Sequence, residues 1–291
     1  MADYRFPGEW IKDGMVLEEN VTSETISRLE SFEMLQGDVL VATYPKTGTT
    51  WLQELVWLVC NNGDTRKSRS VNLNGRIPFL EYKMGGGESG LEMLQTKSPP
   101  HLMMTHLRSD TFRTQIEAGK VNIVIGIRNP KDTLVSFYHF YRMNRSLGNF
   151  KGSWDDFFEL HKAKHILCGD YFRWYSSWLQ YKDKPNVLLV KYEDMHRRMP
   201  DVIKDVSNFL GKKLPQNIID GIVQHLSFDN MSKNNTVNRS IMATFDNKIS
   251  PFLRKGKVGD WKNYFSKEQS DAVDKSYKDI IEPFGVTLSF E

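Results

Sequence analysis

The pattern of apolar positions along the chain predicts strands that alternate with helices. Short apolar runs rich in β-branched residues predict buried strands at residues 39–43, 102–104, 121–127 and 187–190. Apolar residues spaced three and four apart predict helices over residues 49–60 and from Pro130 to about Arg145. Two later helices are predicted around Val202, Val206, Phe209 and Leu210, and around Ile218, Ile219, Ile222 and Val223.

This order of elements predicts an α/β fold, in which a central parallel β-sheet is flanked by helices. Parallel strands need long crossover connections, and helices usually provide them. No repeat, low-complexity tract or proline-rich linker interrupts the chain, so we expect a single domain over residues 1–291. Ligands bind such sheets beyond the carboxyl ends of the strands. Lys46, His106 and Arg128 each follow a predicted strand closely, so we expect a functional site at this edge.

Two segments are predicted to move. Residues 230–257 are polar and lack a long periodic element, which is typical of a flap that closes over a ligand. The three glycines at residues 85–87 mark a second candidate loop of this kind.

Composition narrows the class of protein without naming a function. Hydrophobic residues make up 40% and charged residues 26%, and the net charge of +3 gives no reason to expect nucleic-acid binding. Cys60 and Cys168 are too few for a disulfide framework. There is no apolar leader and no run of about 18 apolar residues. We therefore expect a cytoplasmic protein that does not bind membranes.

The segment Tyr-Pro-Lys-Thr-Gly-Thr-Thr-Trp at residues 44–51 joins the first predicted strand to a helix. A helix N-terminus presents unpaired N–H groups and a partial positive charge, which suit a phosphate. Gly48 allows close backbone approach, Thr49 and Thr50 add hydroxyl donors, and Lys46 adds a charge. The P-loop pattern GxxxxGK[ST] is absent, so this is a phosphate loop of another kind. An ordinary turn with capping threonines is the alternative interpretation.

This segment closely resembles the donor loop of cytosolic sulfotransferases. Three further segments resemble the same family: Thr-His-Leu around His106, Arg-Asn-Pro-Lys-Asp from Arg128 followed by Ser136, and Arg-Lys-Gly-Lys-Val-Gly-Asp-Trp from Arg254 to Trp261. The resemblance extends over about residues 32–290. It implies the donor 3′-phosphoadenosine 5′-phosphosulfate, with adenosine 3′,5′-bisphosphate as product, and no metal.

The resemblance also assigns residues to parts of the donor. The phosphosulfate would be held by Lys46, Thr47, Gly48, Thr49, Thr50 and Trp51, with Trp51 also stacking on adenine. The 3′-phosphate would be held by Arg128, Ser136, Arg254, Lys255 and Gly256, and the adenine pocket would be completed by Tyr192, Leu226 and Phe228. A nucleotide with two phosphorylated positions needs two cationic sites, and guanidinium groups match phosphate bidentately. For a single arginine, a surface salt bridge is the alternative.

The predicted catalytic residues are His106, Lys46 and Ser136. His106 is the candidate general base, and Lys46 would neutralise charge on the bridging oxygen. Two positions depart from the family. Met104 stands where the family usually has a lysine that touches the sulfuryl oxygens, and Leu226 where it commonly has a threonine. We expect a slower or differently tuned enzyme, and Met104→Lys to raise turnover.

The acceptor is predicted to be a small hydroxylated or aminated molecule, aromatic or steroid-like. By position, Phe79, Tyr82, Phe140 and Phe245 match the family's apolar acceptor pocket, although core packing is the alternative for each. The usual dimer motif is degenerate, with Ser266-Lys267 at its centre, so the oligomeric state stays open.

Other patterns are given structural interpretations. His161, His165 and Cys168 have helical spacing but lack a second ligand pair, so we predict no metal site. The aromatic stripe of Tyr171, Trp174, Tyr175 and Trp178 is interpreted as a buried helix face. Two other functions stay open. One is a non-catalytic nucleotide- or ligand-binding protein of the same fold, and the other is a phosphotransferase that needs ATP and Mg²⁺.

Overall fold

A computed structural model describes residues 4–83 and 87–291 of the chain. The strands are β1 Trp10–Lys12, β2 Met15–Leu17, β3 Val39–Thr43, β4 Leu102–Thr105, β5 Asn122–Ile127 and β6 Val187–Lys191. The helices are α1 Ser23–Ser31, α2 Thr49–Cys60, α3 Thr65–Ser68, α4 Leu73–Arg76, α5 Gly90–Gln95, α6 Arg113–Ala118, α7 Pro130–Met143, α8 Trp154–Lys162, α9 Tyr171–Leu179, α10 Tyr192–Arg197, α11 Met199–Phe209, α12 Gln216–His225, α13 Phe228–Lys233 and α14 Lys267–Ile280. The four predicted sheet strands and the four predicted helices are all present, with ends that differ by a residue or a few.

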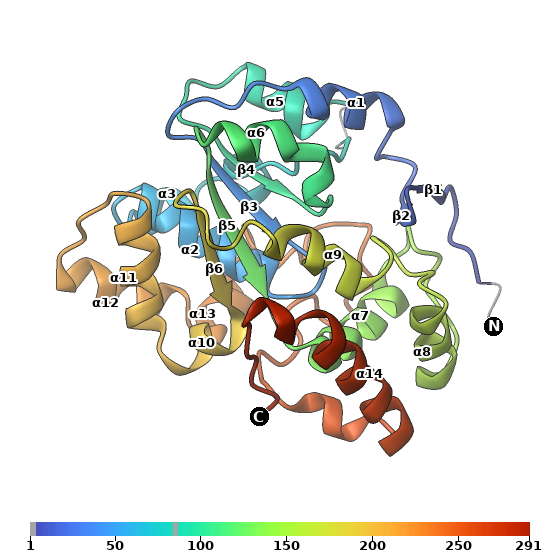
Figure 1. Cartoon of the computed structure of the whole chain (residues 1–291). Helices are drawn as coiled ribbons and strands as arrows, with labels where there is room; N and C mark the ends of the chain where they lie inside the picture. The colour runs from blue at the N-terminus through green and yellow to red at the C-terminus, as the bar shows by residue number, and fades with distance from the viewer. Residues whose placement is uncertain (1–3, 84–86) are drawn as a thin grey trace.

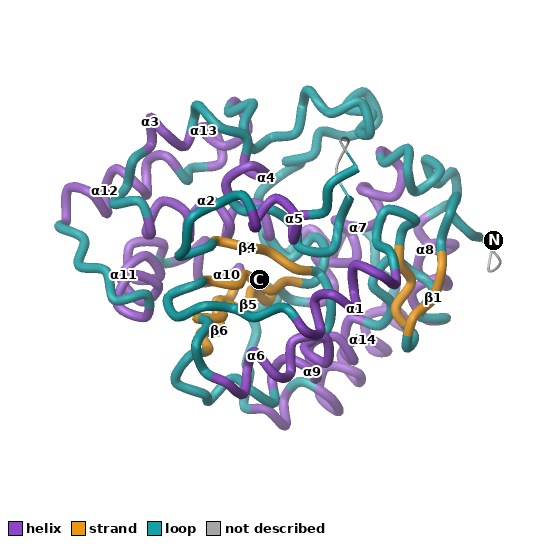
Figure 2. The backbone as a smooth tube through the Cα atoms, turned by 90° about the horizontal axis from the view of Figure 1, so that it is seen from above, coloured by secondary structure: helices purple, strands orange, loops and turns teal. Residues whose placement is uncertain are grey.

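Strands β3 to β6 form one parallel sheet in the order β4-β3-β5-β6, with helices on both faces (Figure 1). The view from above places α2, α4 and α5 on one side of the sheet and α6 and α9 on the other (Figure 2). This is the predicted α/β architecture with a central parallel sheet. The short β1–β2 hairpin is antiparallel and lies apart from this sheet, near α8 (Figure 1).

Along each strand the side chains point alternately to the two faces of the sheet, and each face has its own apolar cluster. Val39 and Val41 of β3 pack in one apolar cluster, with Leu55 of α2. Leu40 and Ala42 pack in the other. Because successive strand residues point to opposite faces, a fully buried five-residue strand contributes to both clusters.

The strand order creates a crevice at the carboxyl end of β3. The chain leaves β3 through α2 and returns as β4 on one side, and then passes through α6 to β5 on the other side. Connections that diverge in this way leave space beyond the strand ends. Lys46, His106 and Arg128 follow β3, β4 and β5 within three residues, so all three lie at this crevice, as the sequence predicts.

The stripe on α9 is a buried helix face, as predicted. Tyr171, Trp174, Tyr175 and Trp178 are each almost fully buried. Their polar atoms bond to the sheet edge: Trp174 Nε1 donates to the His106 carbonyl at 2.7 Å, and Tyr175 Oη to the Gly126 carbonyl at 2.7 Å. The stripe therefore supports the loops of the crevice from behind.

The predicted helical spacing of His161, His165 and Cys168 is wrong. Helix α8 ends at Lys162, and both Lys164 and Cys168 have positive φ angles, which no α-helix allows. His165 Nε2 contacts Glu9 Oε1 at 2.7 Å, an ordinary structural pair. No group of three or more potential metal ligands occurs among the residues that the structure describes.

The structure also bears on three other segments that were interpreted from the sequence. Within residues 4–83 and 87–291, no helix is long and apolar enough to cross a membrane. Ser266, at the centre of the degenerate dimer motif, caps α14 by accepting from the Gln269 N–H. Part of the glycine loop at 85–87 lies outside the described residues.

Candidate active site

The crevice opens into a cavity of about 650 Å³. It is lined by the loops after β3, β4 and β5, by α7 and α10, and by the chain from Leu226 to Lys257. The predicted site residues that line it are Lys46, Gly48, Thr49, Thr50, Trp51, Phe79, Tyr82, His106, Arg128, Ser136, Phe140, Tyr192, Leu226, Phe228, Phe245, Arg254, Lys255 and Gly256. Residues from the whole length of the chain are thus brought to one space.

Thr47 is the exception among the predicted site residues. Its side chain is buried, and Thr47 Oγ1 donates to the Tyr44 carbonyl at 2.7 Å. The hydroxyl therefore holds the turn after β3 together and does not face the cavity.

Backbone geometry explains the glycine of the loop after β3. Gly48 is the N-cap of α2 and has a φ of 93°, a conformation that favours glycine. A Cβ at this position would lie 2.5 Å from Tyr192 Cδ2. Helix α2 begins immediately afterwards, so its unpaired N–H groups point toward the cavity end of the loop. Gly48 thus lets the ring of Tyr192 lie against the loop.

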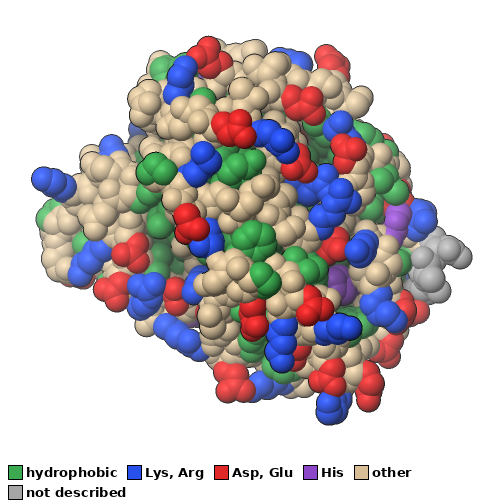
Figure 3. Space-filling view, viewed as in Figure 1, with side chains coloured by type: hydrophobic (Ala, Val, Ile, Leu, Met, Phe, Trp, Pro, Cys, Tyr) green, Lys and Arg blue, Asp and Glu red, His purple; other side chains and the backbone are tan. Residues whose placement is uncertain are grey.

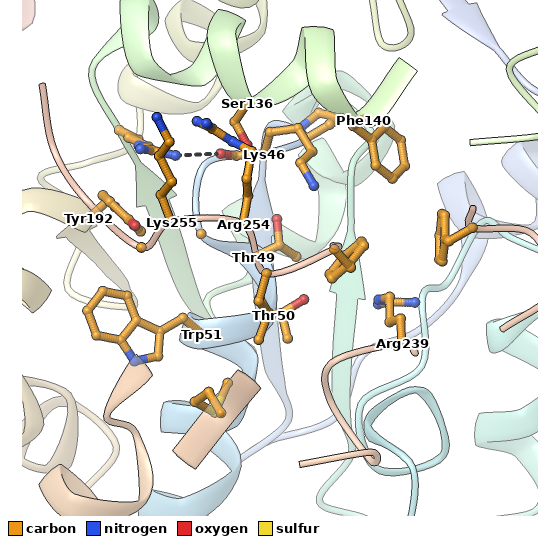
Figure 4. A pocket seen from close by; sticks show the side chains of 18 of the residues that line it. Lys46, Thr49, Thr50, Trp51, Ser136, Phe140, Tyr192, Arg239, Arg254 and Lys255 are labelled. Atoms are coloured by element: carbon orange, nitrogen blue, oxygen red, sulfur yellow. Dashed lines mark hydrogen bonds between the residues drawn. The ribbon is translucent and has the colours of Figure 1, made fainter. Parts of the chain in front are cut away.

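One half of the cavity, which we call the basic half, contains Ser136, Arg254 and Lys255 (Figure 4). Arg128 also belongs to this half. Arg254 and Lys255 both contact Asp260, at 2.6 and 2.7 Å. Buried Asp132 accepts backbone N–H groups of Gly259 and Trp261 at 2.7 and 3.0 Å.

Arg128 joins the basic half to the loop after β3. Its guanidinium lies 4.1 Å from the centre of the Tyr192 ring, and Nη2 lies 3.8 Å from Asp132 Oδ2. Nη2 also donates to the Lys257 carbonyl at 3.1 Å. Three cationic side chains from two distant segments are therefore held in one region.

An aromatic slot borders the basic half. The ring of Trp51 lies 5.5 Å from that of Tyr192, and Trp51 Nε1 donates to the Leu226 carbonyl at 2.9 Å. Phe228 also lines the cavity and is 38% exposed, which is high for a phenylalanine without a ligand. A Cβ on Gly256, which has a φ of 58°, would collide with the ring of Phe228. Glycine is needed here as well, so the two loops pack closely around the slot.

Lys46 lies between the two halves of the cavity (Figure 4). Its Nζ is 4.4 Å from the ring centres of both Phe140 and Phe252. Burial, together with the nearby charges of Arg239 and Arg128, lowers the pKa of Lys46 to about 7. An anion in the cavity would favour the protonated form of this amine.

His106 has the hydrogen-bonding pattern of a base. Its Nδ1 lies 2.6 Å from the Thr43 carbonyl oxygen, which can only accept, so Nδ1 carries the proton and Nε2 has a free lone pair. Burial lowers the pKa of His106 to about 4, so the imidazole is neutral at physiological pH. The backbone N–H of His106 donates to Glu81 Oε1 at 2.6 Å, and burial raises the pKa of Glu81 to about 7. The histidine is therefore fixed in position by its own backbone and its ring nitrogen.

The other half of the cavity, the aromatic half, contains Phe79, Tyr82, Phe140 and Phe245, all predicted, together with Phe252. The ring of Phe140 lies 5.6 Å from that of Phe245, and the ring of Phe79 lies 4.9 Å from that of His106. Apolar walls thus end at the neutral imidazole.

Two residues of the aromatic half, Phe252 and Arg239, are not predicted from the sequence. Phe252 stands two residues before Arg254, so its place beside a predicted basic motif could have indicated it. Arg239 lines the cavity from the polar segment, where a single basic residue gives no recognisable signal. Met104 is fully buried and packs in the core, and it does not line the cavity.

On the face shown in Figure 3, acidic and basic side chains are mixed rather than gathered by sign. The concentration of positive charge is instead inside the cavity. Among the described residues that line it, six are lysine or arginine, and Glu18 is the one acidic residue. The cavity is therefore suited to a strongly anionic ligand.

Comparisons of this chain with a family model and with known proteins indicate the same family. The family model described as "Sulfotransferase domain" matches residues 36–285. Human sulfotransferase 1C2 is 36% identical over 92% of this chain and 90% of its own length, and mouse sulfotransferase 1B1 is 36% identical over 90% and 88%.

Solved structures agree with this result. Mouse sulfotransferase SULT7A1 complexed with PAP superposes with a TM-score of 0.76 at 27% identity, covering 94% of both chains. Retinol dehydratase in a complex with retinol and PAP gives a TM-score of 0.81 at 25% identity, covering 92% of this chain and 89% of its own.

Proposed function

The chain belongs to the sulfotransferase family, and on that premise we propose that it transfers a sulfuryl group from 3′-phosphoadenosine 5′-phosphosulfate to a small acceptor. The sulfuryl group would be transferred to a hydroxyl or an amine of the acceptor. The family membership makes the chain a sulfotransferase enzyme, and the donor, the acceptor class and the residue roles are the proposal.

The observation that carries the proposal is that two groups of anion-binding residues lie beside one aromatic slot. The loop from Lys46 to Thr50 and the N-terminus of α2 suit the 5′ phosphosulfate. Arg128 and Arg254 in the basic half suit a 3′-phosphate. The rings of Trp51, Tyr192 and Phe228, which border these groups, suit adenine. The neighbouring structures contain PAP, the bisphosphate that this donor leaves behind.

The proposed reaction needs positioning and a base rather than a covalent intermediate. The acceptor oxygen or nitrogen attacks sulfur, the bond between sulfur and the bridging phosphate oxygen breaks, and the acceptor proton passes to His106 Nε2. Nε2 can accept this proton because the ring proton of the neutral imidazole is on Nδ1, which donates to the Thr43 carbonyl. Protonated Lys46 stabilises the negative charge that develops on the leaving bisphosphate. Ser136 lines the basic half and is proposed to bind the 3′-phosphate.

The proposed acceptor is a small molecule with an apolar body. The aromatic half of the cavity offers several phenylalanine rings next to His106. Retinol, which is bound by the structural neighbour, is a molecule of that kind with one hydroxyl group.

An acceptor screen tests the proposal directly. Purified protein is incubated in chelator with the sulfonated donor and a panel of phenols, steroids and amines, and mass spectrometry detects sulfated products. We expect transfer that is lost in His106→Ala. If adenosine bisphosphate binds by calorimetry but no acceptor is sulfated, a binding protein of the same fold would be the better interpretation. If transfer occurs only with ATP and Mg²⁺, the proposed donor would be wrong.

A further inference from the structure

Arg239 places a guanidinium group in the aromatic half of the cavity (Figure 4). Its guanidinium carbon lies 5.1 Å from the ring centre of Phe252 and 5.9 Å from that of Phe79. Nη2 donates to Asn74 Oδ1 at 3.2 Å, and Nη1 lies 3.8 Å from Met242 Sδ. These contacts hold the side chain against apolar walls, where a cation is costly unless it gains a partner.

No carboxylate forms an ion pair with Arg239 among residues 4–83 and 87–291, whereas Arg128 and Arg254 have Asp132 and Asp260. The Nε of Arg239 is buried without a hydrogen-bond partner. Burial lowers the pKa of Arg239 to about 10. Arg239 therefore has hydrogen-bonding capacity and charge that the protein itself does not use.

The position of Arg239 relates it to the reacting atoms. The ring of Phe79 contacts both the guanidinium and the imidazole of His106. The ring of Phe252 contacts both the guanidinium and Lys46 Nζ. The positive charge of Arg239 also lowers the pKa of His106 and of Lys46, as expected for a group close to both. An acceptor whose nucleophile lies at His106 and whose body lies along Phe79 would extend toward Arg239.

From this geometry we propose that Arg239 is a specificity residue that selects acceptors carrying an acidic group. The substrate class is then the aromatic hydroxy acids, with the hydroxyl at His106 and the carboxylate paired with the guanidinium. A carboxylate matches the planar donors of arginine bidentately, which a neutral acceptor cannot do. The inference rests on the proposed sulfuryl transfer and adds to it the class of acceptor.

The test compares acids with their esters. The probes are para-hydroxybenzoate, para-hydroxyphenylacetate and para-hydroxyphenylpropionate, each beside its methyl ester, because the three acids differ in the reach of the carboxylate. For at least one pair we expect kcat/KM to favour the acid by about tenfold, which corresponds to about 1.4 kcal/mol.

Substitutions then assign that preference to Arg239. Arg239→Gln should remove this preference by lowering kcat/KM for the acid much more than for the ester. Arg239→Glu should reverse the preference toward tyramine, an amine of similar shape. Arg239→Lys should retain part of it, because the charge remains and the bidentate geometry is lost. Arg113→Gln is the matched control, since Arg113 is exposed at the start of α6 and does not line the cavity. Circular dichroism confirms that each variant is folded.

Two results would overturn the inference. One is equal use of acid and ester by the unmodified protein. The other is an equal loss for both in Arg239→Gln, which would show that Arg239 acts on the sulfuryl group or on folding. Calorimetric binding of the acids in the presence of adenosine bisphosphate separates this inference from the proposed function. Acid binding that depends on Arg239 would support the inference even without turnover, whereas absent transfer would count against the enzyme activity alone.

Discussion

Replacement of Gly48 by alanine tests how the aromatic slot is built. The residue has a φ of 93°, and a Cβ there would lie 2.5 Å from Cδ2 of Tyr192. Tyr192 is buried between this loop and the guanidinium of Arg128, which lies 4.1 Å from the ring centre. Because the ring lies against both Gly48 and Arg128, we expect Gly48→Ala to displace both Tyr192 and Arg128.

The magnitude follows from two separate costs. A positive φ costs a non-glycine residue about 1–2 kcal/mol, and a clash in a packed region costs about 1–3 kcal/mol more. Gly211→Ala is the matched control, because Gly211 has a φ of 66° and a Cβ there would have no neighbour within 4 Å. We expect Gly211→Ala to be destabilised by the positive φ alone, and Gly48→Ala to be destabilised by both the positive φ and the clash. Affinity for adenosine bisphosphate should fall about tenfold or more in Gly48→Ala and stay unchanged in Gly211→Ala.

Urea unfolding measures the two stabilities, and calorimetry measures the two affinities. A double-mutant cycle with Tyr192→Ala then isolates the clash, because alanine at residue 48 should cost only the backbone strain once the ring is gone. If both glycine variants lose equal stability and bind the bisphosphate equally well, the ring of Tyr192 does not depend on Gly48. Our description of the slot would then be wrong.

Three further predictions concern the chemistry. His106→Ala should lower turnover by about a hundred- to ten-thousandfold while affinity for adenosine bisphosphate stays nearly constant; a parallel loss of affinity would contradict its role as base. The pKa of Lys46 is lowered to about 7, so the amine loses its charge as the pH rises through 7. At pH 8 bisphosphate binding should therefore take up a proton, because the bound anion raises that pKa. The enthalpy should vary with the ionisation enthalpy of the buffer, and Lys46→Arg should abolish the effect. Met104→Lys should lower the thermal midpoint, because residue 104 is fully buried in the core, and should raise turnover if the longer side chain reaches the cavity. Unchanged or reduced turnover would show that a lysine at this position does not serve the sulfuryl oxygens.

Much of the fold could be predicted because the relevant signals are local. A buried strand such as β3 is a short apolar run, and α2 repeats its apolar residues at helical spacing. Once parallel strands are predicted, the residues that follow them must gather at one edge. Lys46, His106 and Arg128 were found in this way, and the family resemblance added the roles proposed for them.

The helical spacing of residues gave a wrong prediction where the backbone leaves the helix without a sequence signal. The interval between His161 and Cys168 fits a helix, but α8 ends at Lys162, and two residues with positive φ redirect the backbone. Spacing alone carries no information about where a helix stops when no glycine or proline marks the end.

The sequence by itself determined the alternation of strands and helices, the loop that joins β3 to α2 and the identity of the charged groups. The tertiary structure decided which of those charges are already paired and which are not. Arg254 and Arg239 are both arginines in the same polar stretch, yet one contacts Asp260 and the other lies on phenylalanine rings without a carboxylate partner among the described residues. The physical reason is that pairing and desolvation depend on neighbours that are distant in sequence. Composition and periodicity do not encode those distances directly.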